Sequence, residues 1–129
     1  MTVEATQSGT PAYLAGSSTQ TFTVTNPADL FGGTITGANT KYSSWFGYYT
    51  YSTYPFIYEY SLGYEYVFAG GAGVYLYDYK SGHFWYTQAS YYPFIYDFTL
   101  NAFLYYYKNN TLGAARSFYN ESTHEVISE

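Results

Sequence analysis

An aromatic segment occurs twice in the chain, as YPFIYEYSLG at residues 54–63 and as YPFIYDFTLN at residues 92–101, and its first five residues are identical in the two copies. The segment ends at Gly63 in one copy and at Asn101 in the other, and these are the residue types that most readily adopt a positive φ. Because both copies place such a residue at the same point, the sequence predicts a tight turn between two strands there.

The repeat extends outward from this segment. WFGYY at residues 45–49 resembles FWYT at residues 84–87, and Lys41 and Lys80 each precede these stretches in a small polar turn. One unit is therefore a meander of about four strands. We predict an aromatic repeat at residues 34–71 and a second at 72–110, with a Thr/Ser-rich strand segment at 1–33 and a C-terminal strand and acidic tail at 111–129, all within one domain.

Aromatic residues alternate with other residues along each predicted strand. Tyr58 and Tyr60 share a side with Ile57 and Glu59 opposite, and the same pattern places two further sets of rings on one side each: Tyr64, Tyr66 and Phe68, and Tyr75, Tyr77 and Tyr79. A period of two in Tyr- and Phe-rich sequence is typical of strands. The sequence thus predicts an all-β fold, an antiparallel sandwich or flattened double sheet built from two ~38-residue aromatic repeats plus the N-terminal strand segment.

The N-terminal segment has a different composition. TQTFTVT at residues 19–25 alternates strictly and ends before a proline, which predicts a half-buried strand with Phe22 and Val24 on one face. Such a strand, distinct in composition from the aromatic sheet, is a candidate donor strand that completes the sheet of a neighbouring copy.

Composition excludes several classes of protein. The chain has 21 Tyr, 10 Phe and 2 Trp, no Cys, and 4 Lys plus Arg against 9 Asp plus Glu. Without cysteine there is no disulfide framework and no thiolate metal site, and so few basic residues argue against nucleic acid as a partner. No apolar run approaches the ~18 residues of a membrane span, and the first eight residues lack the pattern of a signal peptide. The aromatic content argues against disorder.

Few residues suggest catalysis. His83 and His124 are expected in a surface turn and in the polar tail. Glu59 and Asp97 occupy equivalent repeat positions and would form an acid pair if the repeats faced each other, but we favour outward charges that protect the aromatic strands from aggregation. We therefore predict no catalytic, metal or cofactor-binding residues and a protein that is not an enzyme. A pocket joining Glu59 or Asp97 to His83 would favour an enzyme instead.

The chain has more tyrosines than one core can bury. A buried tyrosine needs a hydrogen-bond partner for its hydroxyl, and an aromatic face outside the core usually marks a binding or assembly surface. We predict a structural protein that self-assembles into a filament or surface fibre by β-strand addition and tyrosine stacking, with a copy of itself as partner. The predicted assembly interface consists of Tyr13, Phe22, Val24, Tyr58, Tyr60, Tyr64, Tyr66, Tyr75, Tyr77 and Tyr96.

Carbohydrate binding is the main alternative. In this interpretation Trp45, Trp85 and Tyr86 are exposed and stack on the sugar rings of a polysaccharide, as in a cell-wall-attachment module. Self-assembly explains more of the composition, because a sugar site needs only a few aromatic side chains.

The second repeat also carries a resemblance. KSGHFWYT at residues 80–87, running into YPFIYDFTLNAFLYY at residues 92–106, resembles the aromatic-rich C-terminal β repeat segment of predicted secreted proteins from environmental bacteria. RSFYN at residues 116–120 is similar to the closing strand of that segment, so the resemblance covers roughly residues 75–125. It implies an extracellular or cell-surface location and brings no known activity.

Overall fold

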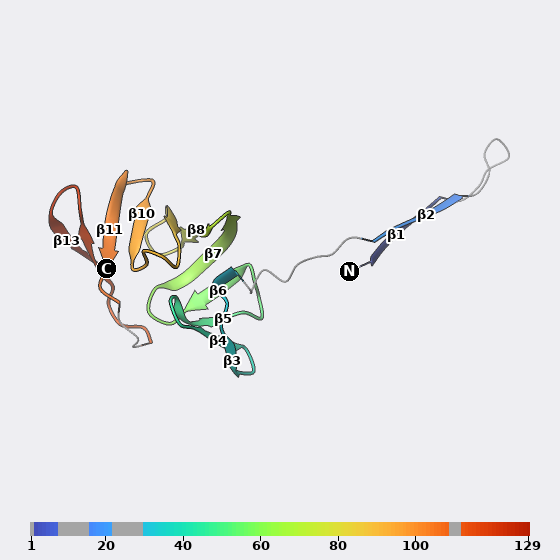
Figure 1. The fold of residues 1–129 in the computed structure, drawn as a ribbon, viewed down its shortest axis with the longest axis horizontal. Helices are drawn as coiled ribbons and strands as arrows, with labels where there is room; N and C mark the ends of the chain where they lie inside the picture. The colour runs from blue at the N-terminus through green and yellow to red at the C-terminus, as the bar shows by residue number, and fades with distance from the viewer. Residues whose placement is uncertain (1, 8–15, 22–29, 109–111) are drawn as a thin grey trace.

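The computed structural model describes residues 2–7, 16–21, 30–108 and 112–129, which form thirteen strands in two antiparallel sheets (Figure 1). Strands β1 (Thr2–Gln7) and β2 (Gly16–Thr21) pair only with each other. The other eleven strands form one sheet in which each strand pairs with the next along the chain. They are β3 (Thr34–Gly37), β4 (Thr40–Ser43), β5 (Gly47–Thr50), β6 (Phe56–Glu59), β7 (Gly63–Gly70), β8 (Gly73–Asp78), β9 (His83–Thr87), β10 (Phe94–Asp97), β11 (Ala102–Tyr106), β12 (Ser117–Asn120) and β13 (Glu125–Ser128).

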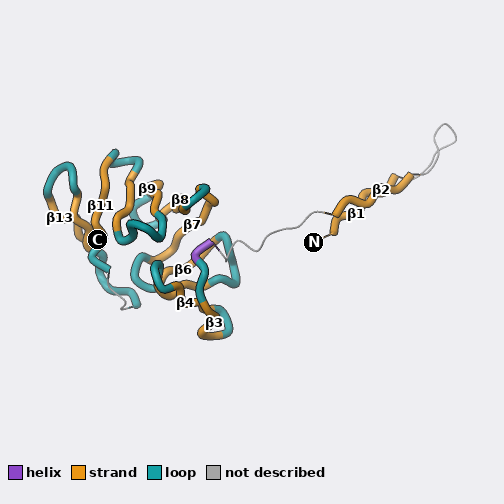
Figure 2. The backbone as a smooth tube through the Cα atoms, viewed as in Figure 1, coloured by secondary structure: helices purple, strands orange, loops and turns teal. Residues whose placement is uncertain are grey.

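The predicted all-β antiparallel fold is confirmed. Short turns join the strands from β3 to β11, and the described residues contain only one short helical turn, at residues 30–31 (Figure 2). Local sequence explains this architecture, because period-two alternation of Tyr and Phe favours strands and glycines supply the tight connections. The run Gly70–Gly73, for example, closes β7 onto β8 through a loop in which Gly71 has a φ of 71°.

The alternation also separates the two faces of the eleven-stranded sheet. Ile57 is 1% exposed, whereas its neighbour Phe56 is 45% exposed. Along β7 the same alternation buries Val67 and exposes Phe68. The inner face forms a single core and the opposite outer face carries exposed rings. The core consists of Phe31, Phe46, Tyr49, Ile57, Leu62, Val67, Val74, Leu76, Trp85, Ile95, Leu104, Tyr106 and Phe118.

The sheet curls around this inner face, so that parts far apart in strand order meet. The ring of Trp45, after β4, lies 5.6 Å from the ring of Tyr92, before β10. Lys108, which follows β11, donates to the carbonyl of Trp45 at 3.2 Å, and Arg116 donates to the carbonyl of Leu62 at 2.8 Å. One continuous sheet therefore encloses its own core, with its two halves facing each other.

Five hairpins of the sheet share one turn design. A buried polar residue ends the first strand, and a residue with positive φ follows four positions later. Asp97 illustrates the design, since its Oδ1 accepts the backbone N–H groups of Thr99 and Leu100 at 2.8 and 2.9 Å. Turn N–H groups that face the interior need such an acceptor. The polar residues are Ser43, Glu59, Asp78, Asp97 and Asn120, and the positive-φ residues are Gly47, Gly63, Gly82, Asn101 and His124.

This design confirms one prediction and corrects another. Gly63 and Asn101 do have positive φ, 106° and 52°. The expectation that Glu59 and Asp97 point outward is wrong, because each is 1% exposed and binds the N–H groups of its own turn. The turns recur every 19 residues, from Glu59 to Asp78 and from Asp78 to Asp97, so the 38-residue repeat spans two hairpins.

The structure describes only part of the strand predicted at residues 19–25. Residues 19–21 of the predicted strand belong to β2, which pairs with β1 of the same chain. Phe22 and Val24 of that strand lie outside the described residues, as does Tyr13.

Candidate functional site

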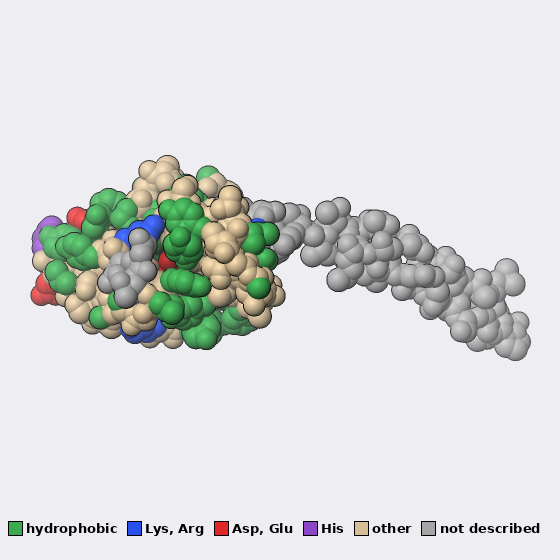
Figure 3. Space-filling model, turned by 90° about the horizontal axis from the view of Figure 1, so that it is seen from below, with side chains coloured by type: hydrophobic (Ala, Val, Ile, Leu, Met, Phe, Trp, Pro, Cys, Tyr) green, Lys and Arg blue, Asp and Glu red, His purple; other side chains and the backbone are tan. Residues whose placement is uncertain are grey.

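The outer face of the sheet gathers the remaining predicted assembly residues. Tyr64 is the most exposed of them at 65%, and Tyr75 is 40% exposed. The others are half-buried: Tyr58, Tyr60, Tyr66, Tyr77 and Tyr96. Hydrophobic side chains form several large exposed groups on the surface in Figure 3, with few charged side chains among them. Two parts of the outer face differ in shape and chemistry.

The first part is a shallow hollow over β6 to β9, here named the aromatic hollow. Six rings surround it in a closed circuit, with centroids of neighbouring rings 4.7 to 6.1 Å apart. Its volume is about 450 Å³. Its described lining consists of Phe and Tyr, so it offers mainly apolar contact, with the tyrosine hydroxyls as its polar groups. The lining residues are Phe56, Tyr66, Phe68, Tyr77, Tyr79 and Phe84.

The second part is a line of five tyrosines across β4 to β7, here named the tyrosine row. Its members, in order of contact, are Tyr42, Tyr48, Tyr60, Tyr58 and Tyr64, with successive ring centroids 4.7, 5.8, 6.4 and 4.8 Å apart. Depressions of about 660 and 320 Å³ flank the last three of these rings. The larger one is also lined by Asn39, Thr50, Ser52 and Leu112.

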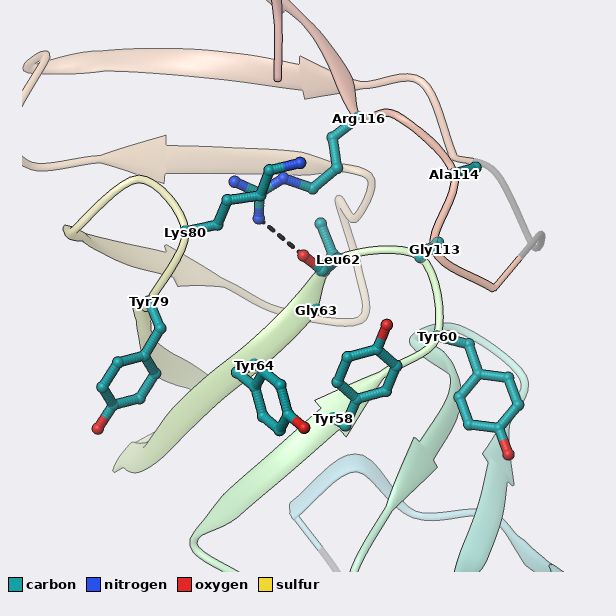
Figure 4. Close-up of a pocket in the computed structure, with 11 residues that line it drawn as sticks. Tyr58, Tyr60, Leu62, Gly63, Tyr64, Tyr79, Lys80, Gly113, Ala114 and Arg116 are labelled. Atoms are coloured by element: carbon teal, nitrogen blue, oxygen red, sulfur yellow. Dashed lines mark hydrogen bonds between the residues drawn. The ribbon is translucent and has the colours of Figure 1, made fainter.

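Figure 4 shows the smaller depression. Tyr58 and Tyr64 lie side by side below it, while Lys80 and Arg116 lie above Leu62. Lys80 is exposed at the rim of this depression.

The residues predicted to stack on sugars do not form one platform. Trp85 is 1% exposed and its Nε1 donates to Asp97 Oδ2 at 2.8 Å, so the prediction that it stacks on a glycan is wrong. Trp45 packs against the core and donates to the carbonyl of Phe31 at 3.0 Å. Tyr86 lies on the other side of the sheet, against Tyr75. Trp85 fills the interior of the curled sheet, whereas Trp45 is partly buried against the core.

A buried ion cluster closes the core below the smaller depression. Arg116 is 1% exposed and donates to Asp78 Oδ1 and Oδ2 at 2.7 and 2.9 Å. It also binds the carbonyl of Leu62 and the Glu129 carboxylate, which joins three segments of the chain. Burial alone would raise the pKa of Asp78, but hydrogen bonds from Arg116 and Ser81 outweigh it and leave that pKa below its usual value.

Glu65 lies next to this cluster, opposite Asp78 in the register of β7 and β8. It is 0% exposed, and burial together with the nearby Asp78 carboxylate raises its pKa well above the usual range. Glu65 therefore holds its proton to a higher pH than an ordinary glutamate. The alternation already places Glu65 on the same face as Val67, which is the sequence signal for its burial.

The structure also joins His83 to Asp97. His83 Nδ1 lies 2.7 Å from Asp97 Oδ2, and both residues line a cavity of about 130 Å³, so a pocket that joins Asp97 to His83, the feature expected of an enzyme, is present. His83 is therefore half-buried rather than simply at the surface. The nearby Ser81 hydroxyl donates to Asp78 and not to the imidazole. The contact thus links two neighbouring turns, and no nucleophile is oriented toward the histidine among the described side chains.

Comparisons with family models, curated proteins and solved structures found no match for this chain. Within the described ranges no helix is long and apolar enough to cross a membrane. In the same part of the chain, no three or more His, Asp or Glu side chains are grouped so that they would hold a metal ion. The aromatic hollow and the tyrosine row make the outer face the best candidate for a functional surface.

Proposed function

We propose that the protein is a non-enzymatic, extracellular or cell-surface structural subunit that assembles with copies of itself through the aromatic hollow and through strand addition. The observation that carries the proposal is the hollow, in which six aromatic side chains form a closed circuit on an exposed face. Apolar patches that remain exposed on a folded chain usually mark interaction surfaces.

The hollow favours an apolar side chain of a second copy as its occupant. Burying one large apolar side chain contributes about 1.5–3 kcal/mol, and contacts between aromatic pairs add about 0.5–1.5 kcal/mol. Candidate side chains are Ile35, Leu112 and Val126, which are 66, 62 and 59% exposed. Because they lie away from the hollow in sequence and on other elements, the contact joins two different surfaces. Contacts of this kind extend into a filament unless the rotation between copies closes a ring.

Low charge supports this proposal. Within the described residues, the lining of the hollow includes no Lys, Arg, Asp or Glu. Docking there removes no charged group from water, which avoids a desolvation penalty of several kcal/mol per ion (order of magnitude).

Strand addition is the second proposed contact, and the β1–β2 hairpin is its proposed donor. A two-stranded hairpin is at best marginally stable alone in water, and its sequences, TVEATQ and GSSTQT, contain little apolar surface to bury. The large sheet ends at β3 and β13. A register shift between Ile35 and Gly37 interrupts β3, and bulges of this kind disfavour pairing. We therefore assign the edge of β13 in a neighbouring copy as the acceptor.

Sedimentation velocity and negative-stain microscopy of the full chain test the proposal. The wild type is expected to form concentration-dependent polymers at neutral pH. Phe68→Lys and Phe84→Lys place a charge in the hollow and should abolish them. Phe103→Lys changes a ring of similar exposure outside the hollow (45% against 42 and 47%) and should leave them intact. Uniform wild-type monomers would contradict the proposal, as would polymers of Phe68→Lys and Phe84→Lys that match the wild type.

A further inference from the structure

We infer that the tyrosine row and its two flanking depressions bind an uncharged polysaccharide chain. This binding site adjoins the aromatic hollow, since Tyr79 lines both the hollow and the smaller depression, but it has polar groups beside its rings and the inference does not depend on self-assembly. It also uses residues other than the tryptophans from which the sequence suggested sugar binding.

The shape of the row favours a chain over a single sugar. Its tyrosines lie on or directly after four successive strands, β4 to β7, and neighbouring strands are about 4.8 Å apart. Tyr64 is the most exposed ring among the residues whose burial the structure describes, and within that part of the chain its ring contact is with Tyr58. Tyr42 and Tyr48 at the other end are each 39% exposed. The apolar C–H face of a pyranose ring packs on an exposed aromatic ring, and consecutive rings of a glycan can follow such a row.

The polar groups beside the row suit sugar hydroxyls. Thr50 Oγ1 accepts the backbone N–H of Tyr58 at 2.9 Å and keeps its own hydrogen to donate. The side chains of Asn39 and Ser52 make no hydrogen bond within the part of the chain that the structure describes. Amide and hydroxyl groups both donate and accept, which is the pattern that neutral sugars require.

Charge distinguishes a neutral glycan from other ligands. The larger depression has no charged side chain among its described lining. In the smaller one, the guanidinium NH2 groups of Arg116 are engaged with Asp78, Leu62 and Glu129, which leaves the single exposed Lys80. Binding of carboxylate- or phosphate-bearing ligands usually relies on a bidentate arginine or clustered cations. Aromatic grooves also hold proline-rich peptides, but the hydroxyl and amide groups beside the row favour a ligand with hydroxyl groups along its length.

Native gel electrophoresis of the full chain in gels containing soluble galactomannan, xyloglucan or mixed-linkage β-glucan tests the inference. At least one of these neutral polymers should retard the wild type, and Tyr64→Ala should weaken the retardation at least ten-fold. Asn39→Asp, which puts a charge into the larger depression without touching the core, should weaken it as well. Tyr107→Ala is the matched control, because Tyr107 is 47% exposed, contacts one ring, that of Tyr105, and lies outside the row. Tyr107→Ala should bind like the wild type.

Several outcomes would overturn the inference. These are unchanged mobility in all three neutral polymers, retardation only by polygalacturonate, and retardation that survives both Tyr64→Ala and Asn39→Asp. Binding of a polyproline peptide without any glycan binding would assign the row to a protein partner instead. Near-ultraviolet circular dichroism checks that each variant keeps its aromatic packing.

Discussion

Replacing Arg116 with alanine is expected to destabilise the folded protein strongly. The guanidinium joins the β6–β7 turn, β8 and the C-terminal residue, through the carbonyl of Leu62 and the carboxylates of Asp78 and Glu129. Removing one partner of a buried ion pair costs about 3–5 kcal/mol, because the other charge stays buried without a counterion. The Glu129 bond adds little, since that side chain is 26% exposed and solvent screens it. The expected loss is a large share of the ~5–15 kcal/mol that stabilises a typical domain.

Urea unfolding followed by tryptophan fluorescence measures this loss directly, because the guanidinium lies 5.5 Å from the ring of Trp85. Arg116→Ala should lower the free energy of unfolding by about 3–5 kcal/mol, which corresponds to a melting temperature lower by about 10–30 °C. Arg116→Lys keeps the charge but not the bidentate hydrogen bonding to Asp78, and it should give an intermediate loss of stability. Lys80→Ala removes an exposed cation at the same depression and should change stability by less than about 0.5 kcal/mol. A decrease in the free energy of unfolding below about 1 kcal/mol for Arg116→Ala would refute the conclusion that this ion pair holds the distant parts of the curled sheet together.

Three further predictions concern pH, the turns and assembly. Because the pKa of Glu65 is raised in the folded state, protonated Glu65 contributes to folding stability fully below about pH 4.3, and this contribution is lost as the pH rises through the folded-state pKa. The stability of Glu65→Gln relative to the wild type should therefore increase as the pH rises from about 5 to 9. A difference in urea midpoint between Glu65→Gln and the wild type that stays constant across that range would contradict the protonation of Glu65 in the folded state. Asn101→Ala puts a side chain without a local hydrogen bond at a φ of 52° and should cost about 1–2 kcal/mol in urea unfolding, while Asn101→Gly should lose less; equal losses would mean that backbone strain is not the cause. Deleting residues 1–29 removes none of the core residues that the structure describes and should leave a folded sheet that forms no filaments in stained images; unchanged filaments would exclude the hairpin as donor.

The strands and their faces were predictable because they depend on local alternation. The sequence alone places Ile57 and Val67 opposite exposed rings such as Phe56 and Phe68, and the structure agrees. It also locates the left-handed turn at Gly63, since few residue types adopt that conformation.

The curl of the sheet was not predictable in the same way. Arg116 meets Leu62 across 54 residues and Asp78 across 38, and no periodic pattern encodes such contacts. The burial of Glu59 and Asp97 also follows from tertiary structure, because their carboxylates are needed only where turn N–H groups face a closed interior. For the same reason Trp85 looked like a binding residue in the sequence, although it fills the core.

The energetics of the outer face explain why two kinds of contact are proposed for assembly. Phe56, Phe68, Tyr79 and Phe84 are each 42–48% exposed. Since full burial of a large apolar side chain contributes about 1.5–3 kcal/mol, covering the remaining half of four rings contributes about 3–6 kcal/mol. Association itself costs about 4–15 kcal/mol in lost freedom, so the hollow alone does not hold two copies together firmly. Strand addition at β13 supplies backbone hydrogen bonds that the hollow lacks. We therefore expect either change alone, a lysine in the hollow or deletion of the hairpin, to prevent polymer formation.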